Sequence, residues 1–145
     1  YFSALKELAP EKEILMSPAS KFYPGMEMDF VECWSRLLDG VPLDILAPQD
    51  SIGCSGCSLA EQPEMWRYWR RVAEAGGIRL WANIELFERR EFGGAMPFDA
   101  AAPERVAAQI RNVAPWVSKC ICWEYPYFTG PARGGAGIRR RIFEN

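Results

Sequence analysis

Four short apolar runs, separated by amphipathic segments, dominate the pattern of hydrophobic and polar positions along the chain. The runs are bounded by turn or polar residues, as short β-strands are, and they cover residues 13–18, 43–49, 79–86 and 119–125. Between them, apolar residues recur at helical spacing. Strand and helix therefore alternate about every 30–40 residues, which is typical of parallel β/α architecture.

Proline and glycine mark where the expected helices begin and end. The first apolar stripe stops at Gly40, the second runs from Pro63 to Gly76, and the third begins at Pro103 and carries Val117 on its apolar face. Proline fits a first helical turn because it needs no N–H partner there, and glycine fits a helix end because it adopts left-handed backbone. We expect three helices between the four strands.

Four β/α units amount to half of an eight-unit TIM barrel, and the length of 145 residues suits one domain. We therefore expect residues 1–145 to form a single α/β domain, a half-barrel of about four parallel (β/α) repeats. A small open α/β sheet is the alternative. No glycine-rich phosphate-binding motif follows any of the strands, so a nucleotide-binding sheet lacks its usual sequence signature.

The third strand carries a carboxylate in an apolar setting. One face of the run 79–87 is apolar throughout, and the other face mixes aromatic and polar residues, namely Trp81, Asn83, Glu85 and Phe87. An unpaired buried charge is costly, so Glu85 either ends the strand in solvent or belongs to a site that uses it.

Polar residues also follow the second and fourth strands, in the form of Gln49, Asp50 and Glu124. Sites in parallel α/β folds form at the C-terminal ends of strands, so these side chains are expected to gather there. The candidate catalytic residues are Glu85, Asp50 and Glu124, and the candidate substrate-binding residues are Gln49, Asn83, Trp123, Tyr125 and Tyr127. Simpler alternatives are a turn or helix-cap role for Asp50, a loop position for Glu124 and core packing for Trp123.

Composition excludes several chemistries. The chain contains no histidine, which removes Ser-His-Asp and Cys-His catalysis and leaves acid–base work to carboxylates, lysine, tyrosine or cysteine. A net charge of −2 leaves no excess of positive charge for binding nucleic acid. No apolar run approaches the roughly 20 residues of a membrane span. The charged run 88–91 is expected to be a solvated loop whose charges pair with one another.

Five cysteines leave one further chemistry open. Cys54 and Cys57 form a C-x-x-C, which suits a redox pair, half of a zinc site or a local disulfide, whereas Cys120 and Cys122 form only a C-x-C within an apolar run. This spacing favours plain thiols, or one loop disulfide, over a metal or redox centre. We expect no bound metal and no cofactor.

Several motifs in combination resemble a known family. They are Gln49-Asp50, Trp81-Ala82-Asn83-Ile84-Glu85-Leu86-Phe87, Pro103-Glu104-Arg105-Val106-Ala107-Ala108-Gln109 and the early Ile14-Leu15-Met16-Ser17-Pro18. Together they resemble a bacterial TIM-barrel domain of unknown function related to glycoside hydrolases, and they match the C-terminal half of that domain. Ser51 departs from the pattern, which has glycine directly after Gln-Asp, and the loop with Cys54 and Cys57 is not a family feature.

The resemblance implies that the four strands are the fifth to eighth of a barrel. Glu85 then ends the seventh strand, where many retaining glycosidases of this fold carry their nucleophile. Glycoside hydrolysis needs two carboxyl groups, about 5–5.5 Å apart for retention and 6.5–9.5 Å for inversion. The usual partner acid ends the fourth strand, outside this half, so within the chain only Asp50 or Glu124 could serve. Three alternatives stay open for the rest of the barrel: a separate N-terminal half, a second copy of the chain, or nothing at all.

Three function classes follow, in decreasing order of support. The first is a glycoside hydrolase-like domain that acts on a poly- or oligosaccharide through its strand-end carboxylates. The second is a non-catalytic carbohydrate-binding barrel with the same cleft, and the third is a metal or redox module at the C-x-x-C. The cellular location stays open, with the resemblance favouring the periplasm or the cell surface.

Overall fold

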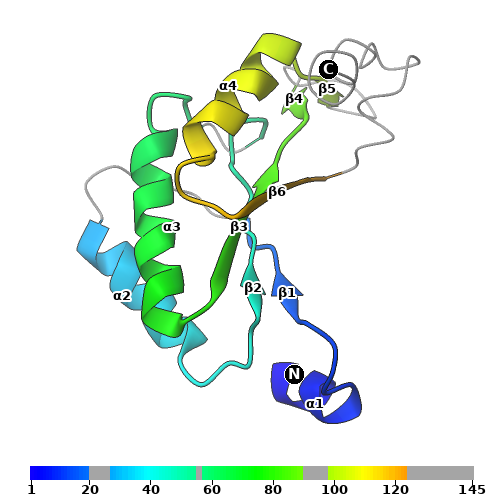
Figure 1. Ribbon diagram of the computed structural model, residues 1–145. Helices are drawn as coiled ribbons and strands as arrows, with labels where there is room; N and C mark the ends of the chain where they lie inside the picture. Colours follow the sequence, from blue (N-terminus) through cyan, green and yellow to red (C-terminus); the bar gives the residue numbers. More distant parts are fainter. Residues whose placement is uncertain (20–26, 55–56, 90–97, 124–145) are drawn as a thin grey trace.

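The structure is a computed structural model, and it describes residues 1–19, 27–54, 57–89 and 98–123. Helices and strands alternate along most of the chain (Figure 1). In chain order the elements are α1 (Phe2–Leu8), β1 (Leu15–Met16), α2 (Glu27–Leu38), β2 (Ile45–Leu46), α3 (Gln62–Gly76), β3 (Arg79–Ile84), β4 (Phe87–Arg89), β5 (Phe98–Ala100), α4 (Pro103–Val113) and β6 (Lys119–Cys122).

A four-stranded parallel sheet organises the fold, with the strand order β1-β2-β3-β6. Its register pairs Ile45 of β2 with Leu15 of β1 and with Arg79 of β3. On the other side of β3, Ala82 pairs with Cys120 of β6. The parallel α/β architecture predicted from the sequence is confirmed, and four strands joined by helices are consistent with half of a TIM barrel.

The first two strands are shorter than predicted at both ends, and at their C-terminal ends a proline interrupts the hydrogen-bond ladder. Pro18 and Pro48 have no N–H to donate, but their carbonyl groups still accept hydrogen bonds from the backbone of Gln49 (3.0 Å) and Asn83 (2.9 Å). The segments therefore stay side by side beyond the last regular strand residue. This places Gln49 in an isolated parallel bridge with Asn83, at the C-terminal end of the sheet.

Three helices lie on one side of the sheet. Figure 1 shows α2, α3 and α4 on the same side, where α3 and α4 pack on β3 and α2 packs on α3. The apolar face predicted for the third strand is buried in this core together with Trp66 and Trp69 of α3; its residues are Leu80, Ala82, Ile84 and Leu86. Burial of this continuous apolar surface is the main source of stability.

The helix boundaries follow the proline and glycine positions. Pro63 lies in the first turn of α3, and Gly77 ends that helix in left-handed backbone with φ +63°. Pro103 starts α4, but this helix ends at Val113, so Val117 does not extend its apolar face as predicted.

A short antiparallel pair, β4 with β5, was not predicted. Glu88 pairs in register with Asp99, and the Glu88 carboxylate forms an ion pair with Arg105 of α4 at 3.0 Å. Glu88 thus pairs with a residue far along the chain, and the prediction of a self-paired charged loop over 88–91 is wrong for Glu88. Residues 90 and 91 lie outside the described part of the chain.

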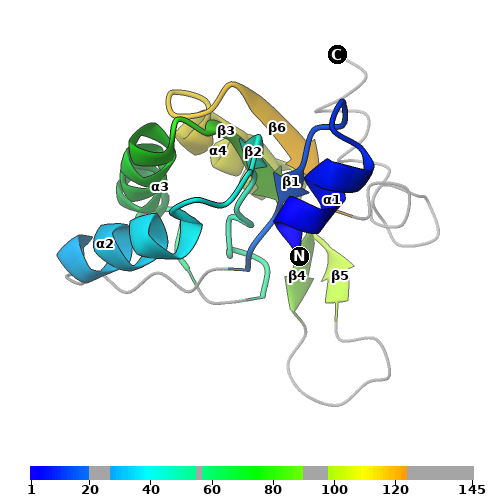
Figure 2. The same ribbon diagram turned by 90° about the horizontal axis from the view of Figure 1, so that it is seen from below.

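The sheet edge at β1 is rich in exposed apolar side chains. Figure 2 shows α1 beside β1, outside the layer formed by the other three helices. Most of the large apolar side chains exposed in the described part of the chain belong to these two elements: Tyr1, Leu5, Leu8 and Leu15. None of the described helices is long and apolar enough to cross a membrane.

Ser51 adopts left-handed backbone, with φ +58°, directly after the Gln-Asp pair. Side chains with a Cβ are strained in this region and glycine is not. Glycine, the residue that the family resemblance leads one to expect here, adopts this backbone without strain, whereas Ser51 is strained.

Replacing Ser51 tests this strain. Ser51→Gly and Ser51→Ala both remove the hydroxyl group, but only glycine adopts this backbone freely, so we expect the glycine variant to be more stable by about 1 kcal/mol. Urea unfolding followed by circular dichroism measures the difference. Equal stabilities of the two variants would show that residue 51 is unstrained.

Candidate functional site

A pocket of about 160 Å³ lies at the C-terminal end of the sheet. Its lining comes from the loop after β2, the end of β3, the β4–β5 pair and the end of β6: Gln49, Cys54, Glu85, Phe87, Phe98 and Trp123. The pocket brings together three predicted site residues, Gln49, Glu85 and Trp123. It adds Cys54, Phe87 and Phe98, which the sequence analysis did not propose as site residues.

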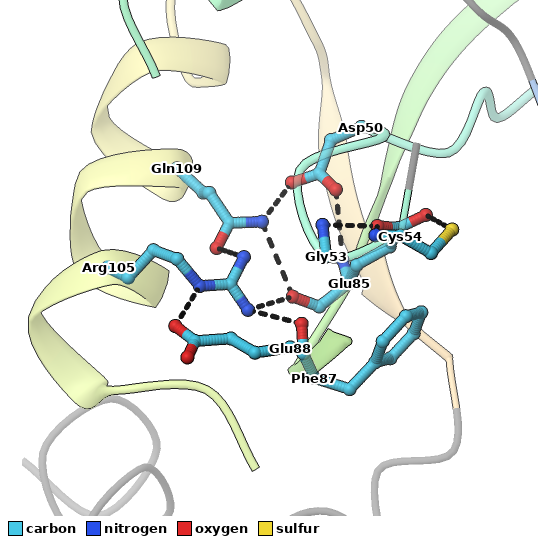
Figure 3. Close-up of polar contacts among 8 residues, drawn as sticks. All are labelled: Asp50, Gly53, Cys54, Glu85, Phe87, Glu88, Arg105 and Gln109. Atoms are coloured by element: carbon cyan, nitrogen blue, oxygen red, sulfur yellow. Dashed lines mark hydrogen bonds and ion pairs between the residues drawn. The ribbon is translucent and has the colours of Figure 1, made fainter. Parts of the chain in front are cut away.

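Glu85 is buried, with 1% of its surface exposed, and its carboxylate is satisfied by the loop after β2 (Figure 3). The backbone amides of Gly53 and Cys54 donate to Glu85 Oε2, at 2.6 Å and 3.2 Å, and the Cys54 thiol donates to Oε1 at 3.5 Å. Hydrogen bonds of this kind compensate for the loss of water around a charged group. Glu85 is therefore neither an exposed strand end nor an unpaired buried charge.

Gly53 allows the loop to approach Glu85 this closely. A Cβ added at residue 53 would lie 2.2 Å from the carbonyl oxygen of Phe87 and 3.0 Å from Glu85 Oε2. The Gly53 carbonyl also accepts a hydrogen bond from the Arg89 amide at 2.9 Å. Only glycine fits between the carboxylate and the β4 backbone.

Asp50 is fully buried and faces the interior of the fold. Its Oδ1 accepts the backbone N–H of Glu85 at 3.1 Å, and its Oδ2 accepts the side-chain amides of Gln62 (3.3 Å) and Gln109. Burial raises the pKa of the Asp50 carboxyl from 3.8 to about 7; the nearby charge of Glu85 also raises it, and the hydrogen bond from Gln109 opposes the rise. This carboxylate positions the backbone of Glu85 and does not line the pocket.

Helix α4 holds the other side of the same backbone. The Arg105 guanidinium donates to the carbonyl oxygens of Phe87 (2.5 Å) and Glu85 (3.4 Å) and to Gln109 Oε1 (2.9 Å). Gln109 donates in turn to the Glu85 carbonyl oxygen at 3.3 Å. Arg105 and Gln109 are four residues apart and share a helix face, so the Pro-x-Arg-x-x-x-Gln motif has a direct structural role.

Asn83 lies in β3 and is not part of the pocket lining. Its side-chain amide donates to Ser17 Oγ at 2.9 Å, which ties the end of β3 to the end of β1. Its buried Oδ1 meets no hydrogen-bond donor among the described residues. The other predicted residues, Glu124, Tyr125 and Tyr127, lie outside the described residues.

Three aromatic rings form one wall of the pocket. The Phe87 ring packs edge-on against Phe98, with centroids 4.8 Å apart, and against Trp123, with centroids 5.3 Å apart. Trp123 is 44% exposed, so this wall continues to the surface. An exposed aromatic wall beside a carboxylate is suited to a ligand with both an apolar face and hydroxyl groups.

The cysteines do not assemble into a metal centre within the described part of the chain. No group of three or more cysteines and carboxylates there is placed to hold an ion, and none of the five cysteines forms a disulfide. Burial raises the pKa of Cys120, and it raises the pKa of Cys122 to about 11. Metal binding and thiol exchange both need thiolates, so the chemistry of these two side chains opposes either role.

The comparisons with known proteins fit this geometry. The family model described as "Domain of unknown function (DUF4434)" matches residues 1–133. The chain belongs to the DUF4434 family. The family resemblance inferred from the motifs is thus confirmed at the level of a domain of unknown function. A comparison with curated proteins gives no match.

A solved structure shares the fold of this DUF4434 chain. It is described as a "putative alpha-L-fucosidase from Bacteroides thetaiotaomicron", and it superposes with a TM-score of 0.81 at 18% sequence identity. The match covers 98% of this chain and 48% of the other, so this chain spans about half the length of that protein. The likeness shows that the two proteins share an α/β fold over this region.

The buried Asp50 makes stability depend on pH. Because its folded pKa is raised above 3.8, Asp50 contributes stability that is complete below pH 3.8 and is lost as the pH rises through about 7. We expect the unfolding free energy of the wild type, relative to Asp50→Asn, to fall by about 2–3 kcal/mol between pH 5 and pH 8. Chemical denaturation at both pH values measures this change.

Asp39→Asn is the control for this experiment, because Asp39 is an exposed carboxylate beyond the end of α2. Its stability relative to the wild type should be nearly the same at both pH values. If the difference in unfolding free energy between the wild type and Asp50→Asn is also the same at pH 5 and pH 8, Asp50 stays ionised in the folded protein throughout this range.

Proposed function

We propose that the chain is the C-terminal half of a glycoside hydrolase-like barrel, and that Glu85 is the carboxylate that meets the sugar. The observation that carries this proposal is the position of Glu85, which lines a partly aromatic pocket at the C-terminal end of a parallel sheet. Active sites of (β/α)₈ barrels lie at this end of the strands. The whole of residues 1–145 would then act as one structural unit.

The lining residues suit a sugar. Phe87, Phe98 and Trp123 would stack on the apolar face of a pyranose ring, and the Gln49 amide would bind a hydroxyl group. Glu85 would act as nucleophile or base. Tyr125 and Tyr127 follow Trp123 in sequence and would extend the stacking surface.

Hydrolysis needs a second carboxyl group. Asp50 is fully buried and bound by two glutamine amides, so its environment favours a positioning role over contact with substrate. Glu124 directly follows the pocket residue Trp123 and stays the candidate within the chain. The other source is the half of the barrel that this chain does not span.

The open edge of the sheet supports the idea of a missing half. The pocket volume of about 160 Å³ is small compared with the roughly 300–1,000 Å³ of complete ligand pockets. In addition, the apolar side chains exposed at α1 and β1 form a surface that another part of the protein would bury. We propose that four further β/α units, from the same polypeptide or from a second copy, close the barrel and complete the site.

The second candidate function is carbohydrate binding without hydrolysis. It is favoured by one observation, namely that Glu85 is the only carboxylate lining the pocket within the described part of the chain. A single carboxylate among aromatic rings is sufficient to bind and orient a sugar. Turnover separates the two candidates.

Glu85→Gln and Trp123→Ala test the sugar site. With p-nitrophenyl glycosides, starting with the α-L-fucoside because of the description of the similar structure, we expect Glu85→Gln to reduce turnover at least about a thousandfold. Trp123→Ala should weaken sugar binding measured by calorimetry. Glu74→Gln, on the exposed part of α3, is the matched control and should behave as the wild type.

The result with the wild type decides between the candidates. Binding without turnover on the whole panel would support the carbohydrate-binding function. Neither binding nor turnover would contradict both functions.

The exposed edge gives a separate prediction. Tyr1 and Leu8 are 91% and 84% exposed, so the double variant Tyr1→Ser with Leu8→Lys should leave folding intact. We expect the 145-residue chain to self-associate in light scattering and the double variant to do so less. Leu37→Lys, which changes an exposed leucine on α2 away from this edge, is the control. A wild-type chain that is monomeric at all concentrations would contradict the proposal that a second copy of the chain covers this edge.

A further inference from the structure

We propose that Cys54 is a positioning residue for Glu85, and that its thiol keeps Glu85 Oε1 oriented in the empty pocket and releases this atom to a ligand. The inference rests on the proposed function of Glu85 and adds to it the residue that orients the reacting atom. Cys54 belongs to a C-x-x-C, a spacing also found in metal and redox sites, and its backbone amide and thiol both contact the carboxylate in the pocket.

The two oxygens of Glu85 are held differently. Oε2 accepts two backbone N–H groups, from Gly53 and Cys54, and these bonds are built into the loop. Oε1 accepts the Cys54 thiol at 3.5 Å. With Oε2 alone held, the carboxylate can still pivot about that oxygen through combined rotations of the Glu85 side chain, and a donor at Oε1 restricts this motion.

The thiol is also the donor that is easiest to displace. An S–H group is a weak donor compared with a backbone amide, so a sugar hydroxyl or a reacting anomeric carbon competes with it on favourable terms. Cys54 is partly exposed and lines the pocket, so its side chain lies where a ligand would enter. Glu85 Oε2 therefore serves as the fixed anchor, and Oε1 is the atom free to act.

The loop after β2 holds Cys54 in place beside Glu85. Gly53 is pinned between the Glu85 carboxylate and the Phe87 carbonyl group, and its own carbonyl group accepts the Arg89 amide. The next residue, Cys54, is placed beside Glu85 as a direct consequence. A residue at position 54 without a side-chain donor would keep the backbone contact to Oε2 and lose the contact to Oε1.

The contact between Cys54 and Glu85 can be measured without a ligand. A carboxylate 3.5 Å from the sulfur opposes loss of the thiol proton, so iodoacetamide should alkylate Cys54 about tenfold faster in Glu85→Gln than in the wild type. Peptide mapping by mass spectrometry gives the rate, with exposed Cys33 on α2 as the internal standard. Equal Cys54 rates in the two proteins would overturn the proposal.

The role toward a ligand is tested with Cys54→Ser and Cys54→Ala, with Cys33→Ala as the control. On the glycoside that the wild type turns over or binds, we expect Cys54→Ser to stay within about threefold of the wild type and Cys54→Ala to lose about tenfold. Rescue by serine separates a donor role from a packing role, because serine restores the donor and not the volume of sulfur.

The outcomes distinguish the two proposals. A wild type that acts on a sugar, together with a Cys54→Ala variant equal to it, would overturn the role of Cys54 and leave the function of Glu85 standing. A wild type that neither binds nor turns over any glycoside would overturn the proposed function and the ligand role of Cys54 with it. The alkylation rates would then still decide whether the two side chains are coupled.

Discussion

The site depends on one buried carboxylate, that of Asp50. Its two oxygens accept hydrogen bonds from the Glu85 backbone, from Gln62 of α3 and from Gln109 of α4, so a single side chain connects the end of β3 with two helices of the outer layer. A buried carboxyl group is tolerated only when its hydrogen-bonding capacity is used, and three donors use it here. Removal of any one partner would leave a polar group unsatisfied next to the pocket, which couples the packing of the helices to the position of Glu85.

The arrangement of strands and helices could be predicted because it follows from local pattern. The apolar runs and the proline and glycine positions identified the four sheet strands and three helices, and the alternation along the third strand identified its buried face. The β4–β5 pair escaped prediction because three residues are too few to show a period, and its two strands lie apart in sequence. Phe98 joined the site only through that pair, so no local pattern indicated it.

The candidate site was predicted in outline, and the roles within it were not. Position at a strand end indicated Gln49, Glu85 and Trp123, and the structure places these three residues in the lining of one pocket. The same criterion cannot distinguish a carboxylate that faces a pocket from one that faces inward, and Asp50 faces inward. Cys54 was missed as a site residue because its partner is thirty-one positions away, and such contacts between a loop and a strand end leave no trace in spacing.

The parallel order of the sheet has a consequence for how the chain folds. Each pair of neighbouring strands joins residues about 30–40 positions apart, because every parallel connection passes through a helix. No strand pair of the main sheet can form as a local hairpin. The chain must therefore lose the conformational entropy of a long loop before the hydrogen bonds between two strands can compensate for that loss. Nucleation therefore falls to the helices and their apolar faces, above all α3 with its two buried tryptophans, and the strand ends that carry the pocket assemble late. The geometry around Glu85 therefore depends on strand pairings that close long loops of the chain.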